Sequence, residues 1–246
     1  MRAILVSLAL AAALAAPLPA DDSIDALATY GSRIEKGTNA ALSGTDPAEA
    51  FRPWSVGNAG GLEALRDAGV TGARFMGMEF ELLLRKGGKD VYMLRTFAHA
   101  SEGKVSFVYI QGEPLDGPPS VTFHPLGSLV GEAEPLACAA RALSALLAGD
   151  GDVPFIDSAV LESLIPFVPA REEGLAGVKK SREGLAGVRS AVRAAAADEI
   201  LVRVDDVTCV AMVEEGQAAG MARESLAIGE GGEVAISIGR YRPFPK

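Results

Sequence analysis

Residues 75–111 constrain the fold of this chain more than any other stretch, because they contain three strand patterns separated by two turns. Between residues 76 and 84, apolar side chains alternate with mostly polar ones, and this period of two gives a strand one apolar face. Gly87-Gly88 can adopt the positive φ angles of a tight hairpin, and residues 101–104 are expected to form the second turn. An antiparallel meander is predicted, and its apolar face requires a cover of helices or of a second sheet.

Helical patterns stand on both sides of this meander. Long helices are predicted at residues 24–42 and 135–147, with shorter ones at 62–68 and 158–164. Strand patterns return near the end of the chain, at residues 200–204, 207–213, 225–228 and 234–239. Asp205-Asp206 is expected to be a turn, and the residues from Arg240 onward are expected to be a polar tail. We therefore predict an α+β fold in which antiparallel β-meanders are covered by helices.

Two domain arrangements are compatible with this order of elements. Residues 21–126 and residues 127–246 each contain helices followed by antiparallel strands. The chain could consist of two tandem helix-then-sheet units, or the second half could continue the same domain and share its sheet. The two halves show no residue-level similarity that would favour the tandem arrangement.

A short internal repeat lies within a basic segment, residues 171–193. The sequence EGLAGV occurs at residues 173–178 and again at 183–188, and two copies are too few for a solenoid. Each glycine inside a helix costs about 1 kcal/mol relative to alanine, so a helix through the two copies is expected to be marginal. An amphipathic segment packed on the sheet is the favoured interpretation, and contact with an anionic membrane surface is the alternative.

The first twenty residues have the layout of a secretory signal peptide. Arg2 precedes a run of mainly apolar residues at 3–16, and Pro17-Leu18-Pro19-Ala20 follows before Asp21. The apolar run is shorter than the roughly 20 residues that span a bilayer, so cleavage near Ala20 is favoured over an uncleaved anchor. We expect the mature protein to be periplasmic or secreted.

The net charge disfavours one class of function, and the two cysteines leave a disulfide open. The chain has 246 residues and a formal net charge of −9, which disfavours general binding to DNA or RNA. Its two cysteines, Cys138 and Cys209, could form a disulfide after export, or each could be a small buried apolar residue.

Candidate catalytic residues are few and carry no family signature. His99 and His124 are the two histidines, and they could act with Glu79 or Glu81 in acid–base or metal chemistry if the fold brings them together. The sequence contains no HExxH, G-x-S-x-G or P-loop motif, and we expect no metal or cofactor. Two glutamates spaced two apart on a strand are typical of a solvated face.

The meander is also rich in aromatic and thioether side chains. Such groups can line a pocket for an apolar ligand, although plain core packing is the simpler interpretation. The candidates for such a pocket are Met76, Met78, Phe80, Phe97 and Tyr109.

These observations favour an exported, non-enzymatic envelope protein that binds a protein partner or a small apolar ligand. The alternative is a periplasmic or secreted hydrolase or isomerase that uses His99, His124 and a carboxylate.

Overall fold

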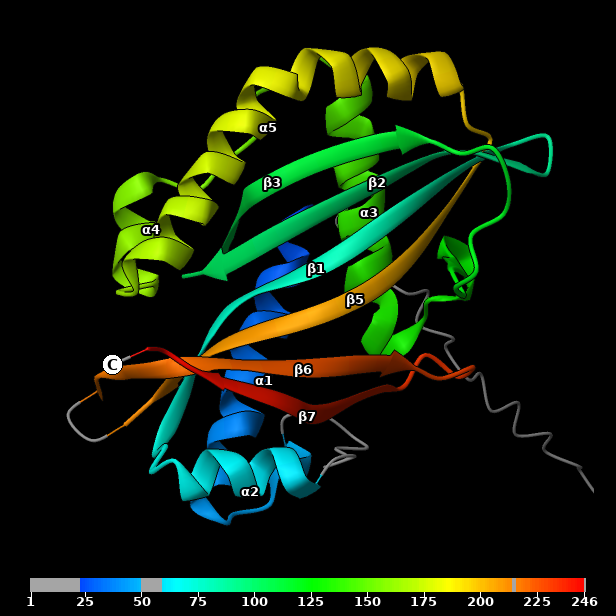
Figure 1. Ribbon diagram of the computed structural model, residues 1–246. Helices are drawn as coiled ribbons and strands as arrows, with labels where there is room; N and C mark the ends of the chain where they lie inside the picture. The colour runs from blue at the N-terminus through cyan, green and yellow to red at the C-terminus, as the bar shows by residue number, and fades with distance from the viewer. Residues whose placement is uncertain (1–22, 50–58, 214–215, 246) are drawn as a thin grey trace, which may run out of the picture.

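The computed structural model describes residues 23–49, 59–213 and 216–245, and it contains one antiparallel sheet with helices on both faces (Figure 1). Six strands follow the order β3-β2-β1-β5-β6-β7, and the short β4 pairs with β5. This arrangement confirms the predicted α+β class and its antiparallel meander.

The elements have the following bounds. The helices are α1 (Ala26–Ser43), α2 (Ala59–Asp67), α3 (Glu134–Ala148), α4 (Ser158–Leu164) and α5 (Val168–Ala195), with 3-10 turns at Pro47–Glu49, Leu126–Ser128 and Gly131–Ala133. The strands are β1 (Gly72–Lys86), β2 (Lys89–Ser101), β3 (Lys104–Pro114), β4 (His124–Pro125), β5 (Glu199–Met212), β6 (Ala218–Ile228) and β7 (Val234–Pro243).

Local signals in the sequence account for several of the element ends. Gly87 and Gly88 both have positive φ in the turn between β1 and β2, a conformation that costs glycine little. Gly44 ends α1 in the left-handed conformation. The Asp157 carboxylate caps α4 by accepting a hydrogen bond of 2.7 Å from the backbone N–H of Ala159.

The two halves of the chain share their sheet. β1 from the first half pairs antiparallel with β5 from the second half, over a register that includes Leu82 opposite Val202. One sheet therefore contains strands from both halves of the chain.

The prediction of a turn at Asp205-Asp206 is wrong. β5 runs without interruption through both residues, and Asp205 is the extra residue of a β-bulge. Glu79 on β1 stands opposite Asp206, whereas Phe80 stands opposite Val204. Because β1 supplies a complete pairing partner on this side, the strand absorbs the aspartates as a bulge instead of reversing.

The predicted polar tail from Arg240 is also wrong, because β7 continues to Pro243. Arg240 pairs with Arg223 on β6, and Arg242 pairs with Met221. Pairing with β6 holds these polar residues in the sheet despite their weak strand propensity.

The two faces of the sheet are covered differently. On one face, which we call the α1 face, α1 and α3 bury Phe80 and Leu82 in the main core (Figure 1). The opposite face, the α5 face, has a smaller cluster in which Met76 and Val210 pack against residues of α4 and α5. Glu79 and Glu81 lie on the α5 face because strand side chains alternate.

Helix α5 is longer and more regular than the sequence suggests. Residues 168–195 form one helix along β3, and both copies of the repeat lie within it. The first copy contributes Leu175 and Val178 to the cluster on the α5 face, whereas Leu185 and Val188 of the second copy pack on the main core. Tertiary burial therefore stabilises a segment that its glycines would leave marginal.

The predicted signal peptide, residues 1–20, lies outside the described residues, and so does the cleavage position at Ala20. Among the described helices, none combines the length and the hydropathy needed to cross a bilayer.

Candidate functional site

The structure does not bring the two histidines together. His99 lies on β2 and is buried, next to the point where Ala98 pairs with Met78 of β1. His124 lies on β4 opposite Val202 of β5, three strands away from β2. Strand spacing and rise place the two residues roughly 25 Å apart, so a shared catalytic pocket is not formed.

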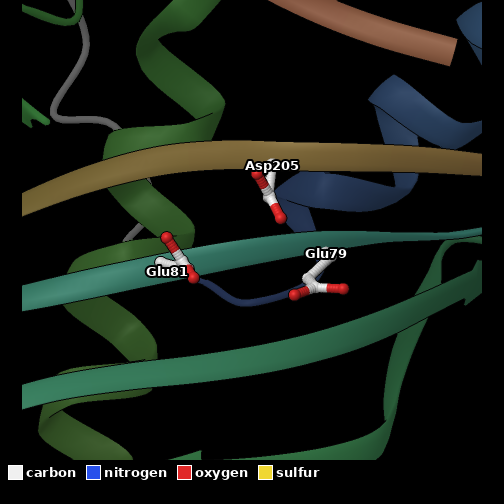
Figure 2. Close-up of side chains that lie close together, drawn as sticks. All are labelled: Glu79, Glu81 and Asp205. Atoms are coloured by element: carbon white, nitrogen blue, oxygen red, sulfur yellow. The ribbon is translucent and has the colours of Figure 1, made fainter. Parts of the chain in front are cut away.

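Glu79 and Glu81 belong instead to a network of charges on the α5 face. Figure 2 shows both carboxylates projecting from β1 toward the same side as Asp205 on the neighbouring β5. Oxygen atoms of the three side chains lie within 4.8 Å of one another. Glu81 is almost completely buried, with 1% of its surface exposed.

Two arginines form ion pairs with the three carboxylates. Arg95 on β2 lies 2.7 Å from Glu81 Oε1 and 3.2 Å from Glu79 Oε1. Arg203 on β5 donates to Glu81 Oε2 at 2.8 Å, and its other terminal nitrogen is paired with Asp205. Glu81 therefore has a guanidinium on each of its oxygens, and burial of its charge is compensated on both sides.

The guanidinium groups decide what the cluster can do chemically. Three carboxylates at this spacing can hold a divalent cation, but a cation at Glu81 would have to displace Arg95 and Arg203. The described contacts therefore favour a rigid ion-pair network over a metal centre. Burial and the Glu79 carboxylate raise the pKa of the Tyr109 phenol, which keeps that hydroxyl protonated beside the network.

The network continues onto β6. Arg223 Nε lies 3.1 Å from an Asp206 oxygen, and the side chain of Arg223 keeps 68% of its surface exposed. Burial raises the pKa of Asp206 from its ordinary value, while the charge of Arg223 opposes that rise. Arg95, Arg203 and Arg223 are thus each paired with carboxylates, and the side chain of each remains partly exposed to solvent.

The residues proposed for an apolar ligand do not line one pocket. Met78 and Phe80 are buried on the α1 face in the main core. Met76, Phe97 and Tyr109 lie in or against the cluster on the α5 face. The sheet separates the two groups, so the simpler interpretation, core packing, fits all five residues.

Both cysteines are buried, and no disulfide joins them. Cys138 lies in α3 and Cys209 in β5, so the bridge that the sequence allowed is not formed. Burial raises the pKa of the Cys209 thiol well above its usual range, and the nearby Glu224 adds to this effect. A protonated, enclosed thiol is a poor nucleophile.

Three arginines of segment 171–193, Arg182, Arg189 and Arg193, attach α5 to the end of α3 and to the loop between α3 and α4. Arg193 donates to the carbonyl oxygens of Ala148 and Gly149 at 2.7 Å, and it pairs with Asp150. Arg182 lies over the Phe155 ring at 5.6 Å. These contacts give the segment a structural role and support the interpretation of an amphipathic element packed on the sheet.

Comparison of the chain with protein-family models, with curated proteins and with solved structures finds no match.

Arg95, Arg203, Arg223 and Asp206 were missed as site residues by sequence reasoning. Arg203 and Asp205 alternate on one strand, which signals a polar face, but nothing local shows that this face meets Glu81. Their convergence depends on the pairing of β1 with β5, which joins Arg203 to a glutamate 122 positions earlier in the chain.

Proposed function

We propose that this protein is an exported, non-enzymatic binding protein whose partner presents an acidic segment to the α5 face of the sheet. The observation that carries the proposal is a row of arginines on this face, all at least partly exposed and most of them anchored by carboxylates. We call it the arginine row and define it as Arg95, Arg203, Arg223 and Arg240.

Exposure and anchoring both support a binding role for this row. Arg95 and Arg223 keep 48% and 68% of their side chains exposed although each is paired with a carboxylate. Glu81 and Asp206 hold the guanidinium groups in place, which lowers the entropy lost when a partner binds. Arginine is enriched in protein interfaces because its planar group can bind a carboxylate through two hydrogen bonds.

Repulsion within the row provides a second line of support. Arg223 and Arg240 stand directly opposite each other on β6 and β7, and both residues are exposed. Like charges in such a cross-strand position destabilise a sheet. An acidic partner would relieve this repulsion. The chain as a whole has a formal net charge of −9 and would repel such a partner, which leaves the arginine row as the favoured contact.

The test is titration of the purified protein with a fluorescent hexaglutamate peptide, as a defined acidic probe, at low and high salt. Charge reversal in the Arg223→Glu and Arg240→Glu variants should weaken binding at least about tenfold. Lys180→Glu, an exposed charge reversal on α5, is the matched control and should bind like the unmodified protein. Equal affinity in the row variants and in the control, or no binding at low salt, would reject the proposal.

Export is tested separately. After expression with access to a periplasm, the intact mass should correspond to a chain that begins at Asp21. Protein of full-length mass inside the cell would reject the proposal that the protein is exported. The proposal that the arginine row binds an acidic partner would then still depend on the peptide titration.

A further inference from the structure

A polar cleft of about 360 Å³ lies at the end of the sheet where β1 begins and β2 ends. Helix α1 forms one wall and Leu164 at the end of α4 contributes to another. Its polar lining includes Ser32, Glu35, Arg74, His99 and Glu102. This volume lies at the lower end of the range that small-molecule sites occupy. The cleft is separate from the arginine row, so binding in the cleft does not depend on the proposed partner.

His99 is the buried member of this lining, with 4% of its surface exposed. Its Nδ1 is hydrogen-bonded to the backbone carbonyl of Met76, and a carbonyl can only accept, so Nδ1 carries the proton. Burial lowers the pKa of His99, and the charge of Arg74 acts in the same direction, so the ring is neutral at pH 7. Its Nε2 is therefore a hydrogen-bond acceptor.

No described residue donates to Nε2 of His99. A buried polar atom without a partner destabilises the fold, so such an atom usually bonds to a ligand or a water when the protein itself offers no partner. Because Nδ1 is held by the strand, Nε2 is the ring nitrogen that remains for a molecule in the cleft. That molecule must supply an N–H or O–H donor.

Arg74 and Glu35 add opposite charges to the same cleft. One terminal nitrogen of Arg74 donates to the Ser163 carbonyl at 3.3 Å, while its Nε has no partner among the described residues. Glu35 on α1 accepts a hydrogen bond of 2.9 Å from the backbone N–H of Phe75, which fixes its carboxylate on the α1 wall. With Glu102 at its rim, the cleft thus offers one cation, two carboxylates and one neutral acceptor.

We propose that this cleft binds a free α-amino acid or a zwitterion of similar size. The carboxylate of the ligand pairs with the guanidinium of Arg74, which is the favoured partner for a planar anion. Its ammonium donates to Nε2 of His99 and is attracted by the carboxylate of Glu35. This arrangement satisfies the two buried nitrogen atoms that the protein itself leaves unpaired.

The chain has two histidines, which makes nuclear magnetic resonance of histidine side-chain nitrogens a direct test. L-alanine added to roughly 10 mM, enough to detect millimolar affinity, should shift the Nε2 signal of His99 and leave His124 unchanged. Propanoate lacks the ammonium and ethylamine lacks the carboxylate, so each should bind at least about tenfold more weakly. The proposal fails if the His99 signal does not move with L-alanine, or if either analogue moves it equally well.

A variant of Arg74 tests whether its guanidinium binds the carboxylate of the ligand. Arg74→Met should lower the affinity for L-alanine at least about tenfold, because it removes the carboxylate partner. Arg182→Met on α5 is the matched control and should retain full affinity. Arg74 is only partly buried, so its variant is expected to fold, which the unchanged His124 signal would verify. Unchanged affinity in folded Arg74→Met protein would overturn the assignment.

Discussion

The hydroxyl of Thr38 on α1 donates a hydrogen bond of 2.7 Å to the carboxyl group of Glu224 on β6, across 186 positions of sequence. Both residues are buried, with 0% and 1% of their surfaces exposed, and they lie within the apolar core. One oxygen of Glu224 has no described hydrogen-bond partner. A carboxyl group in this position is costly to ionise, because burial removes the water that would solvate the charge.

We therefore predict that Glu224 makes stability depend on pH. Burial raises the folded-state pKa of Glu224 from 4.5 to about 7, although Thr38 opposes the rise. The folded state then holds a proton that the unfolded state has released, so stability falls as pH rises from about 4.5 to about 7. The loss can reach about 3 kcal/mol, and urea unfolding at pH 5 and pH 8 measures it.

The Glu224→Gln variant is the control for this pH dependence. It cannot ionise, so its free energy of unfolding should change less between pH 5 and pH 8 than that of the unmodified protein. An equal change in both proteins would show that Glu224 does not carry the effect.

Removal of the charge at Glu81 should lower the free energy of unfolding much more than removal of the charge at Glu79. Glu81→Gln leaves Arg95 and Arg203 facing a neutral amide in a buried position, which should cost about 2–3 kcal/mol because the two arginines are partly solvated. Glu79→Gln changes a more exposed partner and should cost less than about 1 kcal/mol. Chemical unfolding compares the two variants, and similar losses would contradict a central role for Glu81.

Equivalent glycines of the two repeat copies should respond differently to alanine. A Cβ added at Gly184 meets no atom within 4 Å, so Gly184→Ala should stabilise the protein by about 1 kcal/mol through helix propensity. A Cβ added at Gly174 would lie 2.9 Å from Leu161 Cδ2, so Gly174→Ala should gain less or lose stability. The thermal midpoints of the two variants provide the measurement, and equal gains would argue against the contact between α5 and α4.

Both cysteines should remain reduced and unreactive in the folded protein. Cys138 and Cys209 are buried and not joined by a disulfide, and burial raises the pKa of the Cys209 thiol. Intact mass should show two thiols without added reductant, and a thiol reagent should label them only after unfolding. A mass lower by two hydrogens would mean that a disulfide forms after all.

Much of the fold follows from patterns that lie within a few residues of one another. Alternation in residues 76–84, the Gly87-Gly88 turn, the Asp157 cap and the Gly44 end of α1 are all local signals, because they depend on backbone angles and side-chain period. They were sufficient to predict the meander and most helices. They were not sufficient for Asp205, whose bulge depends on the strand beside it.

Tertiary structure decided the parts that depend on partners far away in sequence. The pairing of β1 with β5 joined the two halves and brought Arg203 to Glu81. Apolar residues of α5 pack against both hydrophobic clusters, and this burial stabilises α5 as one continuous helix despite its glycines. The fold also separated His99 from His124 and left His99 with an unpaired nitrogen beside Arg74. The sequence alone determines local conformation, because backbone-angle preferences and side-chain periodicity depend on neighbouring residues. Charge pairing and burial depend on contacts between residues far apart in the sequence, and only the folded chain creates those contacts.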